Sequence, residues 1–383
     1  MNARPYDVLV IGAGSVGMSA GYHLARRGAR VLLIDAFDPP HREGSHHGET
    51  RLIRHAYKKG RVYIPLALRA DELWRELERE AETTLLVRSG VLNIADPEHY
   101  SFGSRPEDAR AFGIPVEMLD AAEMRRRWPG LALPDHFIGM YEPEAGYLYC
   151  ERAIAVCRRL AEAAGAKLVA NAPVLRVAAD GTGIAAETAE GVFRAEKALL
   201  SAGAWFGRLE PFVKFPLKPL RIPVAWFATE SGDYRAGRFP GFTLHTAEGG
   251  FYGFPDIDGG GLKIGKHDGG REWRPGEPFH PFGHEESDEA SLRGAVRQYM
   301  PKAAGRLLRS SVCRYEFTPD EDFVIDRHPQ HPNVLVIGGL SGHGFKFASV
   351  LGEIAADLLL DGRTRFDLGA FALDRFSAGP SGL

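Results

Sequence analysis

Residues 7–17 have the sequence DVLVIGAGSVG, and residues 31–35 have the sequence VLLID. The apolar run before Gly12 predicts a buried strand, and the residues after Gly17 predict a helix. Gly12 permits the tight turn between strand and helix, Gly14 lets the backbone approach a pyrophosphate, and Gly17 lets the helix pack closely on the sheet. The stretch therefore predicts a strand–helix–strand unit of the kind that binds a dinucleotide.

Two further features specify this nucleotide site. Asp35 ends the second strand, where a carboxylate accepts hydrogen bonds from the ribose hydroxyls. A second glycine-rich turn, GGLSGHG at 338–344, follows the apolar run 334–337 and precedes a helix expected from about Phe345 to Asp361. Because each turn leads into a helix whose free N–H groups and dipole attract an anion, two such turns favour FAD over NAD.

Composition describes an ordinary globular protein and excludes several classes of partner. The chain has 383 residues and a net charge of −3, so no field draws it to nucleic acid or to an anionic membrane. No apolar run approaches the length of a membrane span, and the N-terminus leaves no room for a signal peptide. The three cysteines, Cys150, Cys157 and Cys313, suggest no disulfide framework. We expect a cytoplasmic protein that is a monomer.

Hydrophobic periodicity gives the expected elements. Helices are expected at 64–82, 106–112, 121–128, 151–164 and 284–300, and strands at 85–93 and 197–201. Short strands at 167–170, 174–178, 183–187 and 192–195 predict a β-meander, and strands alternate with turns from 221 to 266. The predicted fold class is α/β, with a discontinuous Rossmann-like FAD domain and an inserted substrate domain that contains a large, mostly antiparallel sheet. The FAD domain is assigned to 1–84, 141–215 and 312–383, and the substrate domain to 85–140 and 216–311.

Several longer strings carry a family resemblance. They are GSHHGETRLIRHAY at 44–57, YGFP at 252–255, LKIGKH at 262–267, Cys313 with Tyr315, DEDFVID at 320–326 and LSGHGFKFAS at 340–349. On these strings the sequence resembles the monomeric sarcosine oxidase and N-methyltryptophan oxidase group, within the D-amino-acid-oxidase-like flavoproteins. The similarity extends from about Tyr6 to Phe376.

The resemblance implies how the cofactor is held. In the family, the cysteine at the position of Cys313 is joined to the flavin 8α-methyl group by a thioether, whereas a lone cysteine is otherwise more often a small buried hydrophobe. Cys150 and Cys157 lack that context and are expected to be structural. The expected FAD contacts are Gly12, Gly14, Val16, Gly17, Asp35, Ala36, Ser45, Arg51, Val174, Gly203, Trp205, Cys313, Gly339, Gly342, His343, Gly344 and Lys346.

The resemblance also implies the catalytic groups. Arg54 and Lys346 match the cations that bind the substrate carboxylate, a task that suits a guanidinium fork and a point charge. Lys263 matches a lysine that faces the flavin and helps oxygen accept electrons, and Arg51 matches a residue near the flavin ring. Three further residues match positions that line the substrate cavity: His267, Tyr252 and Tyr315. Taken alone, an arginine in a basic loop or a single histidine is more often a surface or core residue.

The activity that the resemblance implies is oxidative demethylation of an N-methyl α-amino acid such as sarcosine or N-methyltryptophan. Flavin N5 takes the equivalent of a hydride from the N-methyl carbon, the imine hydrolyses to amino acid and formaldehyde, and the reduced flavin converts O2 to hydrogen peroxide. Within the family, an oxidase of pipecolate, proline, glycine, a D-amino acid or a glycated amino acid is also compatible with these residues. Outside it, the residues allow an NAD-linked dehydrogenase or a nucleotide-binding protein without turnover. His46, His47 and His55 lack partners at ligand spacing, so no metal site is expected.

Overall fold

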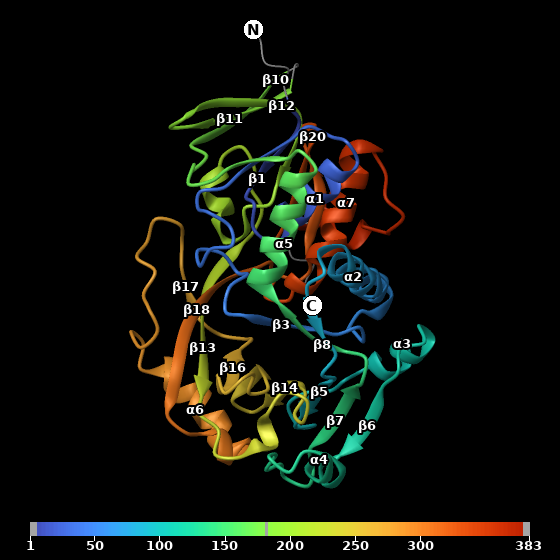
Figure 1. The fold of residues 1–383 in the computed structure, drawn as a ribbon, viewed down its shortest axis with the longest axis vertical. Coiled ribbons are helices and arrows are strands. Elements are labelled where there is room, and N and C mark those ends of the chain that lie inside the picture. The colour runs from blue at the N-terminus through green and yellow to red at the C-terminus, as the bar shows by residue number, and fades with distance from the viewer. Residues whose placement is uncertain (1–5, 181–182, 378–383) are drawn as a thin grey trace.

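The computed structural model describes residues 6–180 and 183–377. Its first sheet has eight strands and includes both strands of the N-terminal strand–helix–strand unit (Figure 1). The strands β1, β2, β9, β12 and β20 pair in parallel in the order β20-β12-β1-β2-β9, so their carboxyl ends lie at one edge. The bounds are β1 (Tyr6–Ile11), β2 (Val31–Ile34), β9 (Lys167–Val169), β10 (Arg176–Asp180), β11 (Gly183–Thr188), β12 (Gly191–Leu200), β19 (Val324–His328) and β20 (His331–Gly338).

The central strands of this sheet are buried on both faces. In β1, Val8 and Val10 belong to one apolar cluster, whereas Leu9 and Ile11 belong to another. This period of two explains why the strand is apolar throughout, as expected for a parallel strand covered on both sides. The helices on the first face are α1 (Ser15–Arg26), α2 (Gly60–Ala81), α5 (Cys150–Ala163) and α7 (Ala348–Leu360).

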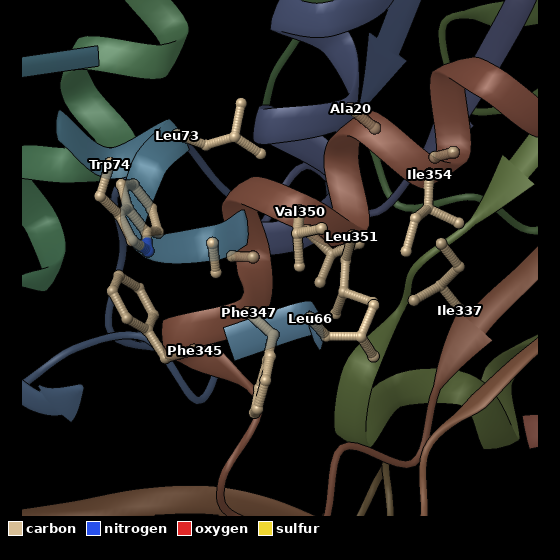
Figure 2. Packing of buried hydrophobic residues seen from close by; sticks show 14 of the residues in the cluster. Ala20, Leu66, Leu73, Trp74, Ile337, Phe345, Phe347, Val350, Leu351 and Ile354 are labelled. Carbon is tan, nitrogen blue, oxygen red and sulfur yellow. The ribbon is translucent and has the colours of Figure 1, made fainter. Parts of the chain in front are cut away.

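Aromatic packing fixes the turn that precedes α7. The Trp74 ring from α2 stacks on Phe345 with ring centroids 6.0 Å apart and planes at 8°. The Trp74 indole N–H donates a hydrogen bond to the carbonyl oxygen of Lys346 at 2.8 Å. Figure 2 shows Trp74 and Phe345 face to face, beside Phe347 and the apolar side of α7. The second glycine-rich turn is therefore anchored to α2 as well as to its own strand.

A nine-stranded sheet forms the lower half of the molecule in Figure 1. Its neighbouring strands are antiparallel except for the parallel pair β5–β14. The strands are β5 (Val91–Ala95), β6 (Glu117–Asp120), β7 (Ile138–Glu142), β13 (Lys218–Phe227), β14 (Gly241–Thr246), β15 (Gly249–Phe254), β16 (Leu262–Lys266), β17 (Arg271–Glu272) and β18 (Leu307–Phe317). The helices in this half are α3 (Arg105–Ala111), α4 (Ala121–Arg127) and α6 (Ser287–Tyr299).

Short elements complete the fold. A three-stranded sheet consists of β3 (Thr50–Ile53), β8 (Gly146–Tyr149) and β4 (Leu86–Val87). The 3-10 helices are η1 (Gly203–Leu209), η2 (Gly232–Tyr234), η3 (Pro301–Ala303), η4 (Phe345–Phe347), η5 (Gly369–Phe371) and η6 (Leu373–Phe376). Among the helices of the described residues, none has both the length and the apolar character needed to cross a membrane.

The α/β architecture with a large, mostly antiparallel second sheet is confirmed, but three local predictions were wrong. The strand at 167–170 is not part of the meander, because β9 pairs in parallel with β2 at the opposite edge of the sheet. The strands expected at 192–195 and 197–201 are one continuous strand, β12. The strand expected at 85–93 is broken between Val87 and Val91: β4 and β5 belong to different sheets, and Gly90, with a φ of 68°, lies in the connection.

The proposed domain boundaries remain a prediction. The strands of the first sheet all fall in the segments assigned to the FAD domain, of which residues 1–5 and 378–383 lie outside the described part of the chain. The second sheet departs from the assignment at two places, because β7 ends at Glu142 and β18 extends to Phe317.

Replacing Gly17 by alanine tests the close packing of α1 on the sheet. A Cβ at this position would lie 1.9 Å from the carbonyl oxygen of Gly12, a backbone atom that has no room to move aside. We expect Gly17→Ala to lower the free energy of unfolding by about 1–3 kcal/mol, the usual cost of overpacking, and to weaken flavin retention. Gly294→Ala is the control, because a Cβ there meets nothing within 4 Å and should stabilise α6 by about 0.5–1 kcal/mol. Equal unfolding midpoints for the two variants would contradict this account.

Candidate active site

The first glycine-rich turn leaves its backbone bare toward a cavity. Gly12 has a φ of 90°, and a Cβ there would lie 2.6 Å from the carbonyl oxygen of Ser201. At Gly14 a Cβ would meet only the His46 imidazole, at 3.4 Å. No side chain caps α1, and its first turn holds no acidic residue, so its free N–H groups are available to an anion.

Asp35 is held next to this turn. Its carboxylate accepts hydrogen bonds from the backbone N–H of Ala13 at 2.7 Å and of Phe37 at 2.9 Å. The His41 imidazole lies 3.3 Å from the same carboxylate. Asp35 lines the cavity while these donors fix its direction, as expected for a residue that binds ribose.

One cavity of about 600 Å³ connects both glycine-rich turns with the second sheet. Most of the predicted site residues line it. They are Gly12, Gly14, Val16, Asp35, Ala36, Ser45, Arg51, Arg54, Val174, Gly203, Trp205, Tyr252, His267, Tyr315, Gly342, His343, Gly344 and Lys346.

Four predicted residues stand behind the cavity wall. Gly17 packs against Gly12, and a Cβ at Gly339 would lie 2.5 Å from the Thr318 methyl group. Cys313 and Lys263 are the other two, and both are fully buried side chains of the second sheet. Cys313 and Lys263 each contact the 44–51 segment, part of which lines the cavity.

Arg51 connects this segment to Cys313. Its guanidinium donates hydrogen bonds to the carbonyl oxygens of Ser45 and His47, each at 2.8 Å. The same nitrogen lies 3.5 Å from the Cys313 sulfur. The thiol therefore sits against a buried cation directly behind the cavity wall.

Lys263 contacts the same segment from β16. Its ammonium donates to the Thr50 carbonyl oxygen at 2.9 Å, to the Thr50 hydroxyl at 3.2 Å and to the Gly48 carbonyl oxygen. It also lies 4.6 Å from the centre of the Phe254 ring. Burial, together with the charge of Arg51, lowers the pKa of Lys263 to about 7. Lys263 is thus buried against the 48–50 segment and is not among the residues that line the cavity.

Three more charged or titratable groups meet at the far end of the cavity. The Arg54 guanidinium donates to the side-chain oxygen of Asn93 at 3.0 Å, and the Lys346 ammonium donates to the carbonyl oxygen of His343 at 2.7 Å. Burial lowers the pKa of Lys346 well below its usual range, with Arg54 as a further cause. Burial and the charges of these two cations lower the pKa of His267 to about 4. The imidazole is therefore neutral at physiological pH.

Tyr252 and Tyr315 form a pair beside these groups. Their hydroxyl oxygens lie 3.1 Å apart, and burial raises the pKa of Tyr252 to about 12. A Cβ at Gly342 would lie 2.6 Å from the Tyr315 ring and 3.3 Å from the His267 ring. The second glycine-rich turn therefore passes directly over this part of the second sheet.

Several wall residues were missed by the sequence analysis. They are Phe37, His41, His46, Thr243, His245, Phe251 and Glu316, among others. The signal for two of them was available, because Thr243 and His245 alternate on one strand and therefore share a face. Glu316 offered a weaker signal, a carboxylate between the aromatic residues Tyr315 and Phe317 in β18.

The residues present fit FAD. The cavity has two uncapped helical ends, a fixed acid for ribose and a long wall that reaches the second sheet. The Nε2 atom of His46, which lines the cavity, is buried without a hydrogen-bond partner, as expected where a polar ligand completes the site. No group of three or more His, Cys, Asp or Glu side chains in the described residues is arranged to hold a metal ion.

Comparisons with known proteins agree with a flavin site in this cavity. A family model described as FAD dependent oxidoreductase matches residues 7–358. The chain is 43% identical to monomeric sarcosine oxidase from Bacillus sp. (strain B-0618) over 97% of this chain and 96% of that protein. It is 46% identical to N-methyl-L-tryptophan oxidase from Salmonella heidelberg (strain SL476) over 97% of this chain and 99% of that protein. A solved structure of NikD, an unusual amino acid oxidase, superposes with a TM-score of 0.85 at 25% identity and covers 97% of this chain and 98% of its own.

Glu316 gives the site a measurable pH dependence. Burial raises the pKa of this carboxyl from 4.5 to about 7. Between these values the folded protein keeps a proton that the unfolded chain has released, so the free energy of unfolding falls as the pH rises. Above pH 7 the free energy of unfolding is lower by up to about 3 kcal/mol than it is at acidic pH. Glu316→Gln should remove this pH dependence of stability, because the amide cannot ionise.

The measurement is the unfolding midpoint of both proteins at pH 5 and pH 8. The wild-type protein should lose more stability over this interval than Glu316→Gln. Parallel pH profiles would mean that Glu316 does not carry a raised pKa.

Proposed function

The chain belongs to the FAD-dependent oxidoreductase family, and from this premise we propose that it oxidises N-methyl α-amino acids to the amino acid, formaldehyde and hydrogen peroxide. Two kinds of relative support this reaction, a sarcosine oxidase and N-methyltryptophan oxidases, each more than 40% identical over nearly the whole chain. The balanced reaction consumes one O2 and one water for each methyl group removed.

The convergence of Arg54 and Lys346 on one cavity wall is the observation that carries the proposal. Neither side chain forms an ion pair with a carboxylate among residues 6–180 and 183–377; each donates to a neutral oxygen instead. A buried ammonium beside a partly buried guanidinium, neither with a counter-charge, is costly unless an anion binds between them. The carboxylate of an amino acid is the anion that a guanidinium fork and an ammonium recognise best.

The same charges act on the substrate nitrogen. A positive field in a buried cavity lowers the pKa of an amine, because it disfavours a second positive charge. His267, which is neutral, can accept a hydrogen bond from the N–H of the substrate without adding charge. We infer that the cavity binds the substrate as the free amine, whose lone pair assists loss of hydride from the methyl carbon.

Bound FAD supplies the electron acceptor for the substrate and the electron donor for O2. Asp35 and the N–H groups at the start of α1 would hold its nucleotide half, and the 339–344 turn would lie over its ring. Lys263 would lower the cost of placing negative charge on oxygen, acting through the 48–50 segment on which its ammonium is anchored. We also propose that the protein is cytoplasmic, since its three buried cysteines form no disulfide, and that it is a monomer.

The direct test is incubation of the purified flavoprotein with single substrates in air. Sarcosine or N-methyltryptophan should bleach the flavin anaerobically and yield formaldehyde and hydrogen peroxide in equal amounts in air. Proline, pipecolate, glycine, D-alanine and a fructosyl amino acid form the comparison panel, because each represents a competing class of oxidase. Bleaching by a panel member but by no N-methyl amino acid would overturn the proposal and identify the class to which the enzyme belongs.

We propose further that Cys313 carries the flavin through a thioether, which the family resemblance implies and the neighbouring Arg51 supports. The guanidinium lies 3.5 Å from the sulfur and would hold it in place beside the cofactor. Forming the C–S bond removes two hydrogens, and O2 would accept the two electrons. Denatured wild-type protein should keep its yellow colour, and the peptide containing Cys313 should gain the mass of FAD less two hydrogens. Cys313→Ser should release all flavin on denaturation, whereas Cys150→Ser, which alters another buried thiol, should retain it. Release of flavin from the denatured wild type would refute the linkage.

A further inference from the structure

A buried hydrogen-bond network lies behind Arg54, and Asn93 is at its centre. The side chain of Asn93 is fully buried on β5. Its oxygen accepts hydrogen bonds from Arg54 at 3.0 Å, from Arg105 at 3.2 Å and from the Thr243 hydroxyl at 3.1 Å. An amide oxygen has two lone pairs, so three donors saturate it.

The other half of the amide fixes its orientation. The Asn93 NH2 group donates to the Met140 carbonyl oxygen at 3.0 Å and to the Glu142 carboxylate at 3.3 Å. Both acceptors lie on β7, the antiparallel neighbour of β5. Because one end of the amide meets only donors and the other only acceptors, the side chain cannot flip without losing bonds at both ends.

The one carboxylate of the network is engaged away from Arg54. Glu142 accepts hydrogen bonds from the backbone N–H groups of His55 at 2.9 Å and Ala56 at 3.0 Å. Its other oxygen lies 3.7 Å from the guanidinium of Arg105. The charges of Glu142 and Arg105, both almost fully buried, therefore compensate each other. The charge of Arg54 therefore has no carboxylate in this network to balance it.

We propose that Asn93 is a positioning residue that holds Arg54 by a neutral oxygen, so that the guanidinium is fixed in direction but keeps its full charge for the substrate carboxylate. Arg54 has a buried Nε without a partner, as expected for a group that waits for a ligand. An aspartate at position 93 would still accept a hydrogen bond from Arg54 but would neutralise it, and it would lose the two bonds that the NH2 group donates. This inference rests on the proposed function, because it assigns Arg54 to the substrate carboxylate.

The test compares an anionic and a neutral substrate of the same shape. Wild-type protein should prefer sarcosine to sarcosine amide by more than tenfold in kcat/KM, and acetate should perturb the spectrum of the bound flavin. In Asn93→Asp we expect the Kd of acetate and the KM of sarcosine to rise at least tenfold. The kcat of sarcosine and the KM of the amide should change less than threefold, since Arg54 remains in place. Damage to the fold alone would impair both substrates alike.

Two further variants separate charge from geometry. Asn93→Ala removes the acceptor without adding charge, so its loss of acetate affinity should be smaller than that of Asn93→Asp. Asn333→Asp makes the same chemical change at the surface, where the amide donates to the Glu196 carbonyl oxygen. It should leave the Kd of acetate and the preference for sarcosine over sarcosine amide unchanged. In an Arg54→Met background, Asn93→Asp should add no further loss of acetate affinity, because both changes act through one guanidinium.

The outcomes also separate this inference from the proposed function. Acetate affinity within twofold of wild type in Asn93→Asp, or an equal loss in Asn93→Ala and Asn93→Asp, would overturn the inference even if N-methyl amino acids are oxidised. Conversely, the acetate affinity of Asn93→Asp can drop as expected while the wild-type protein oxidises no N-methyl amino acid. That result would refute the proposed function and leave the inference about Asn93 standing. If Asn93→Asp does not retain flavin, the acetate affinity and substrate ratio of Asn93→Ala decide, and wild-type values there refute the positioning role.

Discussion

The close approach of α1 to the carboxyl ends of β1 and β12 is the constraint on which the cavity depends. Gly12 and Gly17 permit it, since a Cβ at either position would overlap backbone atoms of this same contact. Helix α7 then packs on α1 with equal closeness, because a Cβ at Gly352 would lie 2.3 Å from the Ser19 hydroxyl. Two helical N-terminal ends are thereby brought to one edge of one sheet. Without this packing there would be no shared wall for the nucleotide and the ring of a flavin.

A second regularity concerns how the cations of the site are held. Arg51 and Lys346 donate to backbone carbonyl oxygens, Lys263 donates to carbonyl and hydroxyl oxygens, and Arg54 donates to an amide oxygen. In the described residues none of the four forms an ion pair with a carboxylate. Neutral acceptors satisfy the N–H groups and leave the charges uncompensated. Burial, and after it the uncompensated charges of neighbouring cations, lowers the pKa values of Lys263, Lys346 and the nearby His267. The cost of that arrangement is offset when negative charge binds or develops in the cavity.

The division between what could and could not be predicted from the sequence follows the range of the interactions. The two glycine-rich turns, Asp35 and the strand–helix–strand unit are local patterns, and the family resemblance supplied the cations. The position of β9 depends on pairing with β2 across the sheet, which periodicity does not encode. The bonds of Asn93 join strands that are adjacent only after folding. That Lys263 faces the ring stays a prediction, since its ammonium is held by oxygens of Gly48 and Thr50, which come from a distant part of the sequence.

The two proposed carboxylate-binding groups belong to different sheets, and this has a consequence for specificity. Arg54 follows β3 and is held by Asn93 from the nine-stranded sheet, whereas Lys346 belongs to the turn after β20, which Trp74 anchors to α2. The distance between the two cations is therefore set by how the sheets meet, while β14 and β15 provide another part of the cavity wall. Except for Thr243, which donates to Asn93, residues there can change without altering the contacts that hold Arg54 and Lys346. This separation explains how relatives of similar identity to this chain can act on substrates as different in size as sarcosine and N-methyltryptophan.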